Sequence, residues 1–270
     1  DGNAVLDLAE LEPAGTTMAA RRLRARIKGL PPWYLNELPK GFVAEERVVG
    51  TGFASPSAQV DISPDGSVRV LSTHEQVLGG PDDQVYLGCR LPANGAYAAD
   101  IAAAARSVGE ELASEGAVGR AAVDFVVTVD DAGRWRHYAL EINLRKGGTT
   151  HPYTALRNLI VGSYDAEAGQ YLAADGSPRG YVSTDNLVSE EWTTLPVADV
   201  LRSLDDAGLI FDRGRGVGVV PYMLSGLAID GRFGLTAIGR TSDEAQELFD
   251  GCRTAVDLLA RRTAAGGAVR

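Results

Sequence analysis

The sequence predicts an α+β fold, because segments typical of antiparallel hairpins are interspersed with segments of helical spacing. Residues 130–133 (Asp-Asp-Ala-Gly) separate two runs rich in β-branched and aromatic residues, which is the composition of a hairpin. Ile101, Ala105, Val108 and Leu112 recur at helical spacing. We expect this helix to pack behind that hairpin.

Local signals predict the other elements in chain order. Residues 16–28 predict a short helix, which the proline pair at 31–32 ends. Residues 41–50 begin and end with glycine and predict a strand, and residues 58–62 and 68–72 predict a hairpin around the turn at 63–66. Residues 152–159 predict a helix with Pro152 at its first position. Residues 222–229 and 233–238 predict another hairpin around Asp230 and Gly231, and the capping-box spacing of Thr241 and Glu244 predicts a helix through about residue 261.

Composition narrows the class of protein. The 270 residues suffice for one large or two modest domains. A net charge of -10 argues against a nucleic-acid surface, and two cysteines fit a reduced, cytoplasmic protein. No apolar run approaches membrane-spanning length, and the start has no signal-peptide pattern. Because the sequence lacks an initiating Met and opens with strand-like residues 4–8, we expect a fragment or an incompletely ordered protein.

The hairpin around residues 130–133 predicts a metal site. If its loop centres on Ala132 and Gly133, Asp124 lies opposite Glu141, and Asn143 shares their face because side chains alternate along a strand. Facing carboxylates about 4.5–5.5 Å apart at Cβ destabilise a sheet unless a cation neutralises them. These oxygen ligands suit Mg²⁺ or Mn²⁺, with water and phosphate oxygens as further ligands. The alternative is a solvent-facing hairpin whose acids only keep it soluble.

The loop after this hairpin predicts an anion site. Arg145 and Lys146 place two cations beside the metal, and Gly147 and Gly148 allow the backbone amides to turn toward an anion. The next three residues lie at the N-terminus of the following helix, where amides and the helix dipole favour a phosphate or carboxylate: Thr149, Thr150 and His151.

The hairpin and loop resemble the magnesium-binding segment of the ATP-grasp ligases, in which an Asp on one strand and a Glu-x-Asn on the next hold two metal ions against ATP. The D-alanine:D-alanine ligases have the same order of motifs. Residues 141–152 (Glu-Ile-Asn-Leu-Arg-Lys-Gly-Gly-Thr-Thr-His-Pro) look closer to the peptide ligases of the pheganomycin type. The resemblance continues through residues 72–80, 85–90 and 234–239, so it covers most of the chain.

The resemblance implies an ATP-grasp fold with two domains, the C-terminal part of a lid at residues 1–49 and a large nucleotide- and metal-binding domain at 50–270. It implies that the strand at 41–50 lies along the adenine, through Glu45, Glu46 and the backbone of Arg47 and Val48. The lid lysines and glycine-rich phosphate loop are not visible, since residues 1–3 (Asp-Gly-Asn) resemble only the end of that loop. We therefore expect an incomplete enzyme.

The resemblance also implies the function, which is ATP-dependent carboxylate–amine ligation through an acyl phosphate. Its partners would be a small-molecule carboxylate and an amine or peptide, with a homo-oligomer as a further possibility. Where D-alanine ligases have an Arg two residues before the metal Asp, this chain has Ala122, and either Arg120 or Arg145 could supply the missing catalytic cation. We expect a structural hydrogen bond for His74. The alternative function is a catalytically silent nucleotide-binding or scaffolding domain.

Overall fold

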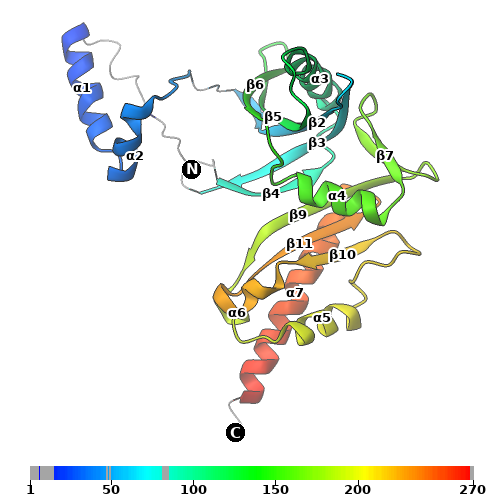
Figure 1. Cartoon of the computed structure of the whole chain (residues 1–270). Helices are drawn as coiled ribbons and strands as arrows, with labels where there is room; N and C mark the ends of the chain where they lie inside the picture. The colour runs from blue at the N-terminus through cyan, green and yellow to red at the C-terminus, as the bar shows by residue number, and fades with distance from the viewer. Residues whose placement is uncertain (1–5, 7–14, 47, 49, 81–84, 268–270) are drawn as a thin grey trace. The chain divides into compact units, whose positions relative to one another are not determined.

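The computed structural model describes residues 6, 15–46, 48, 50–80 and 85–267 (Figure 1). The chain forms two compact units, one of Asp1–Val48 with Gly79–Val85 and one of Val49–Leu78 with Tyr86–Arg270. The first unit contains helices α1 (Thr16–Lys28) and α2 (Pro32–Glu37) and the short helix η2 (Leu38–Lys40). The predicted helix at residues 16–28 is confirmed, and it ends before Gly29 as the proline pair requires.

The predicted strand at residues 41–50 is wrong within the described residues. Residues 41–46 form no regular secondary structure, and strand β1 (Thr51–Ala54) begins only after Gly50. A strand needs a neighbour to accept its backbone hydrogen bonds and bury its apolar side chains. Phe42 and Val43 instead are 69% and 82% exposed.

The second unit is built on a sheet with strand order β1-β5-β2-β3-β4-β9-β11-β10, in which β6 takes the other edge of β5. A small hairpin of β7 (Gly162–Asp165) and β8 (Gln170–Ala173) joins β9. The main strands are β2 (Pro56–Ile62), β3 (Val68–Gly79), β4 (Val85–Leu91), β5 (Gly119–Val129), β6 (Trp135–Asn143), β9 (Pro178–Val188), β10 (Gly218–Tyr222) and β11 (Arg232–Gly239). The hairpins predicted at residues 58–72 and around 130–133 are both confirmed.

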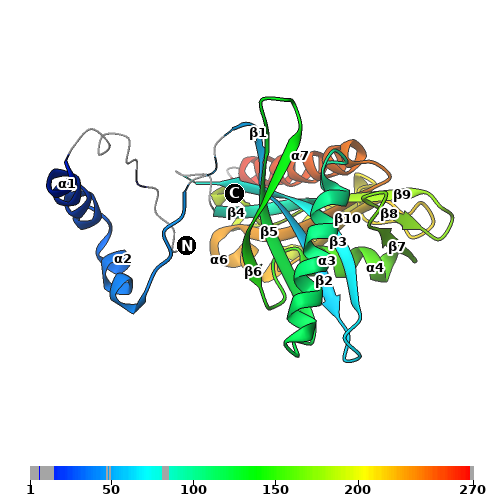
Figure 2. The same cartoon turned by 90° about the horizontal axis from the view of Figure 1, so that it is seen from above.

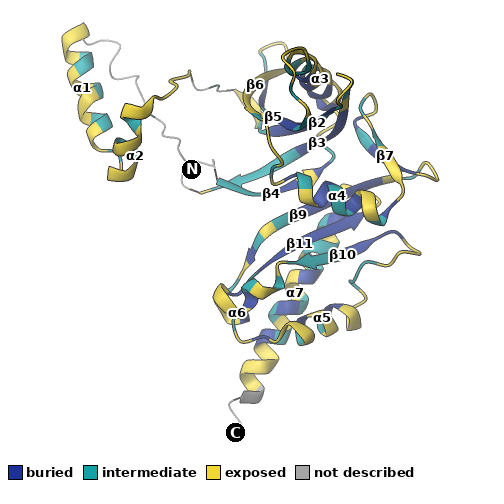
Figure 3. Ribbon diagram, in the orientation of Figure 1, coloured by how far each residue is buried: buried dark blue, intermediate teal, exposed yellow. Residues whose placement is uncertain are grey.

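Helices cover the sheet and enclose its apolar cores. Helix α3 (Ala98–Ser114) packs on β2 and β5, where Ile101 and Ala105 are fully buried, which confirms its predicted place behind the hairpin (Figure 2). Helix α7 (Ser242–Gly267) packs on β9 and β11, next to α5 (Val197–Asp206). Strands β2, β5 and β11 are buried along most of their length, whereas β6 is exposed (Figure 3). This mixture of helices and antiparallel strands confirms the α+β fold class.

The prediction of a hairpin at residues 222–229 and 233–238 is confirmed for its second strand, β11, and wrong for most of its first. Strand β10 ends at Tyr222, and the short helices η4 (Leu224–Gly226) and α6 (Leu227–Asp230) follow it. Met223 is left-handed, with φ of 54°, so the extended chain stops there. Leu227 is 1% exposed, and its burial in the core beside η3 (Glu190–Trp192) favours a helical turn over an alternating strand.

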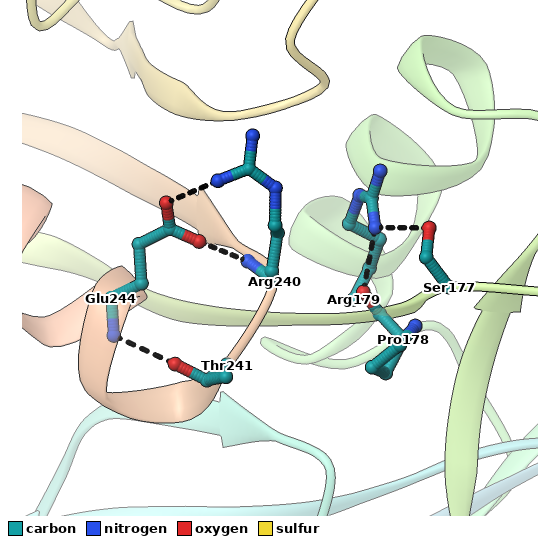
Figure 4. A network of polar contacts seen from close by, with 6 residues as sticks. All are labelled: Ser177, Pro178, Arg179, Arg240, Thr241 and Glu244. Carbon is teal, nitrogen blue, oxygen red and sulfur yellow. Dashed lines mark hydrogen bonds and ion pairs between the residues drawn. The ribbon is translucent and has the colours of Figure 1, made fainter.

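The predicted cap of α7 is confirmed (Figure 4). The Thr241 hydroxyl accepts a hydrogen bond from the Glu244 amide at 3.1 Å. The Glu244 carboxylate accepts a hydrogen bond from the Arg240 amide at 2.6 Å and forms an ion pair with the Arg240 guanidinium at 3.1 Å. The helix runs to Gly267, beyond the predicted residue 261. The same view contains Arg179, whose guanidinium donates to Ser177 and to the Pro178 carbonyl.

Candidate active site

The hairpin of β5 and β6 places Asp124 directly opposite Glu141, as predicted, but by a different route. Next to the turn Val129 pairs with Trp135, one residue away from the predicted register. Continued to the site, that pairing would set Asp124 against Leu140. A register shift between Asp124 and Phe125 leaves Leu140 as the extra residue of a bulge and brings Glu141 onto the face of Asp124.

Asp124 is the half-buried centre of the site. Gln76 on β3 donates its side-chain amide to Oδ1 of Asp124 at 2.9 Å, and Asn143 donates to Oδ2 at 3.1 Å. Burial, with the nearby Glu141 carboxylate, raises the pKa of Asp124, against the opposing effect of hydrogen bonds from Ser57 and Gln76 and of the Arg145 charge. Burial and the facing Glu141 carboxylate thus both disfavour the ionised form of Asp124, and a bound cation would favour it.

This donor set fits a hard divalent cation. Asp124 and Glu141 supply carboxylate oxygens, and the Oδ1 of Asn143 is an acceptor that its hydrogen bond to Asp124 does not use. Among the described residues, no group of three or more His, Cys, Asp and Glu side chains could hold a metal ion, so this candidate site has Asn143 as its third protein ligand. Two carboxylates and one amide leave positions for water and phosphate, which is the arrangement that Mg²⁺ favours.

The two candidate arginines lie in different surroundings. The charge of Arg145 lowers the pKa of Asp124. Arg145 itself is exposed, and its guanidinium donates to the carbonyl of Lys146, another exposed residue, at 3.5 Å. Arg120 instead reaches the Thr154 hydroxyl at 3.5 Å on α4 (Thr150–Leu159). The charge of Arg145 therefore acts on Asp124, whereas Arg120 contacts the helix.

The loop between β6 and α4 is anchored to the sheet. The Gly147 amide donates to the Thr150 hydroxyl at 3.1 Å, which in turn donates to Gln59 on β2 at 3.2 Å. The Gly147 amide therefore has a partner within the loop and does not turn toward an anion as predicted. Helix α4 begins at Thr150, two residues earlier than predicted. Thr149, just before it, is buried.

Two aromatic rings hold the other end of this loop. The backbone of Gly148 is not left-handed. Glycine is needed at this position because any Cβ would lie 2.8 Å from the Tyr86 ring on β4. His151 is exposed and packs against Tyr222 of β10, with ring centroids 4.2 Å apart and ring planes tilted by 43°. The loop thus joins the acidic hairpin to strands β4 and β10.

A buried polar layer under the site was not predicted from the sequence. Ser57, Gln59 and Ser72 are almost fully buried, and Gln59 hydrogen-bonds Ser72 at 3.3 Å. Gln76 extends the layer to Asp124. The available signal was polar residues at alternate positions of β2 and β3, but which face they share depends on pairings that the sequence does not reveal.

His74 belongs to this layer and makes a structural contact. Its side chain is fully buried, and its Nε2 lies 2.5 Å from the Tyr181 hydroxyl, which confirms the expected structural hydrogen bond. Burial lowers the pKa of His74 to about 3, so the ring is neutral at pH 7.

The proposed adenine-binding residues lie in the first unit. Glu45 and Glu46 are exposed and Val48 is half-buried, in a segment without strand structure. Arg47 lies outside the described residues. Their role in nucleotide binding stays a prediction.

The second unit is thus an α+β domain with an acidic hairpin and a basic loop side by side, an arrangement suited to phosphoryl chemistry. Residues 199–251 match the family model described as the PGM1 C-terminal domain. The chain is 33% identical over 245 residues to the L-propargylglycine–L-glutamate ligase of Streptantibioticus cattleyicolor, covering 90% of this chain and 48% of that protein. The chain is therefore related in sequence to a ligase over most of its own length.

Solved structures with a similar arrangement of elements include the phosphoribosylaminoimidazole carboxylase ATPase subunit from Aquifex aeolicus, with 15% identity, coverage of 78% of this chain and 58% of that chain, and a TM-score of 0.48. Another is N5-carboxyaminoimidazole synthetase from Staphylococcus aureus complexed with ADP, with 15% identity, coverage of 78% and 52%, and a TM-score of 0.46. The chain spans about half the length of the curated relative and of these structures. Among the described residues, no helix is both long and apolar enough to cross a membrane.

Proposed function

We propose that this chain carries the metal and substrate site of an ATP-dependent carboxylate–amine ligase. The observation that carries the proposal is the facing pair Asp124 and Glu141, joined by Asn143 and followed at once by the basic loop. A homologue named as a ligase of two amino acids supports it. In this proposal residues 50–270 form the large catalytic domain and residues 1–49 part of a lid.

The proposed reaction has two steps. An oxygen of the carboxylate substrate attacks the γ-phosphorus of ATP, forming an acyl phosphate and releasing ADP. The nitrogen of the amine substrate then attacks the acyl carbon, phosphate leaves with the electrons of the C–O bond, and the amine loses a proton as the amide forms. Catalysis of this kind depends on positioning and on charge neutralisation more than on a protein nucleophile.

The residues divide this work between them. Asp124, Glu141 and Asn143 would hold magnesium or manganese, which supplies positive charge to the phosphate oxygens. Arg145, whose charge lowers the pKa of Asp124, would bind the carboxylate and its acyl phosphate in a bidentate manner, with Lys146 adding charge. Residues 147–151 would hold the carboxylate substrate beside the metal.

Several wider assignments belong to the same proposal. Glu45 and Glu46, with the backbone of Arg47 and Val48, would contact the adenine. Arg120 would support the site through α4. The substrates would be a small-molecule carboxylate and an amine or peptide, and the protein would act in the cytoplasm, with a homo-oligomer as one possible state.

A screen of the complete gene product containing this chain tests the function. Purified protein would be incubated with ATP and Mg²⁺ against pairs of amino acids and peptides, with phosphate release and product mass measured together. We expect at least one pair to give equal amounts of phosphate and amide, and Asp124→Asn to abolish both. Binding of ATP without phosphate release for any pair would instead favour a nucleotide-binding scaffold.

A further inference from the structure

The buried polar layer contains two glutamines, and each is hydrogen-bonded to a different half of the site. Gln76 on β3 donates its side-chain amide to Oδ1 of Asp124 at 2.9 Å. Gln59 on β2 accepts the Thr150 hydroxyl at 3.2 Å and donates to the Ser72 hydroxyl at 3.3 Å. The first glutamine therefore contacts the acidic hairpin. The second contacts the loop of residues 145–151, which we call the substrate loop.

Gln76 fixes the orientation of the Asp124 carboxylate from outside the hairpin. Strand β2 lies between β3 and β5, so the Gln76 side chain reaches across one strand to Asp124. A carboxylate only accepts hydrogen bonds, and each of its oxygens has two lone pairs. With Gln76 bound to Oδ1 and Asn143 bound to Oδ2, each oxygen keeps a lone pair for a cation. A support of this kind holds a ligand in the geometry that the metal requires.

Gln59 fixes the first residue of α4 and, through it, the substrate loop. The Thr150 hydroxyl that donates to Gln59 also accepts the Gly147 amide at 3.1 Å. Gln59 is 1% exposed, and its amide nitrogen is bound to Ser72 of β3, so both ends of its side chain are occupied. A substrate cannot reach this side chain. Gln59 can therefore influence the reaction only through the loop that it holds.

We propose that Gln76 and Gln59 are positioning residues for different parts of the reaction, Gln76 for the metal ligand Asp124 and Gln59 for the substrate loop. This inference rests on the proposed function and gives the buried layer a role in it. Loss of the Gln76 amide would let the Asp124 carboxylate rotate, which weakens metal binding. Loss of the Gln59 amide would release the Thr150 hydroxyl and let the loop move, which weakens binding of the carboxylate substrate.

A purely structural layer would behave differently. Removing a buried hydrogen bond from such a layer lowers the stability of the whole domain, so metal binding and substrate binding would decline together. The hydrogen bonds of Gln76 and Gln59 instead go to different residues on different elements. The inference therefore predicts two losses that separate from each other.

The test uses the complete gene product and measures two quantities. Binding of Mn²⁺ in the presence of a non-hydrolysable ATP analogue is followed through the EPR signal of the free ion, which needs no turnover. The KM for the carboxylate substrate is measured with ATP, amine and Mg²⁺ saturating. Gln76→Met and Gln59→Met each remove an amide at similar side-chain length, and Gln246→Met on α7 is the matched control. Gln246 donates to Oδ1 of Asp250 at 2.9 Å, the same distance as between Gln76 and Asp124.

We expect Gln76→Met to raise the dissociation constant for Mn²⁺ by about tenfold or more and to leave the carboxylate KM near wild type once the metal is saturating. Gln59→Met should raise the carboxylate KM by about fivefold, the factor expected for one lost hydrogen bond, with Mn²⁺ binding unchanged. Thr150→Val breaks the same bond from α4 without a change in the buried glutamine, so it should give a similar KM. Thr150→Ser keeps the hydroxyl and should restore the wild-type value.

Three results would overturn the inference while leaving the ligase intact. They are Mn²⁺ binding by Gln76→Met equal to that of Gln246→Met, a carboxylate KM in Gln59→Met and Thr150→Val equal to that of Gln246→Met, and a parallel loss of both quantities in Gln76→Met and Gln59→Met. A wild-type protein that binds no Mn²⁺ and forms no amide with any substrate pair would overturn the proposed function, and the inference with it.

Discussion

His74 should make this fold sensitive to acid. The side chain is fully buried against Tyr181, and burial lowers its pKa from 6.5 to about 3. The folded pKa lies below the unfolded one, so the unfolded chain binds the proton first as the pH falls. The stabilising contribution is therefore complete above pH 6.5 and declines from there down to about pH 3.

The size of the effect follows from the shift. Each pH unit is worth about 1.4 kcal/mol, so His74 alone should cost about 3 kcal/mol of unfolding free energy at pH 4.5 and about 5 kcal/mol at pH 3. The neighbouring Tyr181 hydroxyl and Cys89 thiol stay neutral over this range, because burial raises the pKa of both. They therefore offer the imidazolium no negative charge.

Urea denaturation at pH 7.5, 6, 5 and 4.5 would measure this contribution. His74→Gln keeps an amide that can bond to the Tyr181 hydroxyl but cannot ionise, and His137→Gln removes an exposed histidine of β6 as the matched control. Carboxylates titrate alike in all three proteins, so the difference in slope isolates His74. If His74→Gln loses stability between pH 6.5 and 4.5 as steeply as wild type and His137→Gln, the buried neutral imidazole is not the cause.

Three further predictions concern the hairpin and loop. Glu141→Ala should abolish ligation. It should change the free energy of unfolding by under about 1 kcal/mol, because Glu141 is exposed on an edge strand and its removal relieves repulsion with Asp124. Turnover equal to that of the wild type would exclude Glu141 from the site. Arg145→Lys should lower kcat and kcat/KM for the carboxylate together with little change in the KM for ATP, and unchanged constants for both substrates would remove Arg145 from the mechanism. Gly148→Ala should reduce turnover because its Cβ would meet the Tyr86 ring at 2.8 Å, whereas Gly95→Ala, outside the loop and with no atom within 4 Å of the added Cβ, should behave as wild type. Equal activities of the two alanine variants would contradict the packing argument.

The hairpin illustrates what the sequence could predict. The turn residues led to the expectation that Asp124 lies opposite Glu141, and the structure has this pair, although the register on which the expectation depended differs. The assumed uninterrupted ladder was wrong, because the pairing beside the turn differs by one residue and the bulge at Leu140 compensates for it. A bulge depends on how the strand twists against its neighbours, which local sequence does not determine.

The errors elsewhere have a similar origin. Residues 41–50 and 222–229 have strand-like composition, but a strand also requires a partner in the right place. At residues 222–229 the burial of Leu227 in the core prevails over the strand-like composition, and Leu227 begins a helical turn. Gln76 could not be assigned to the site because β3 reaches Asp124 only through the order of the folded sheet.

The loop was predicted in outline but not in detail. Its residues do lie at a helix N-terminus and beside the acidic hairpin, as the sequence indicated. The sequence predicted that the amides of Gly147 and Gly148 turn toward an anion. In the structure the Gly147 amide bonds to Thr150, and Gly148 packs against the Tyr86 ring. The side chains that decide this, Tyr86 and Gln59, come from strands far away in the chain.

The central claim is that the carboxylate is activated as an acyl phosphate, and an isotope transfer tests it directly. The complete gene product would be supplied with ATP, Mg²⁺, an amine and a carboxylate labelled with ¹⁸O in both oxygens, and the released phosphate analysed by mass spectrometry. The proposed reaction transfers one labelled oxygen to phosphate for each amide formed, with ADP as the nucleotide product. Amide formation with unlabelled phosphate, or with AMP in place of ADP, would contradict it.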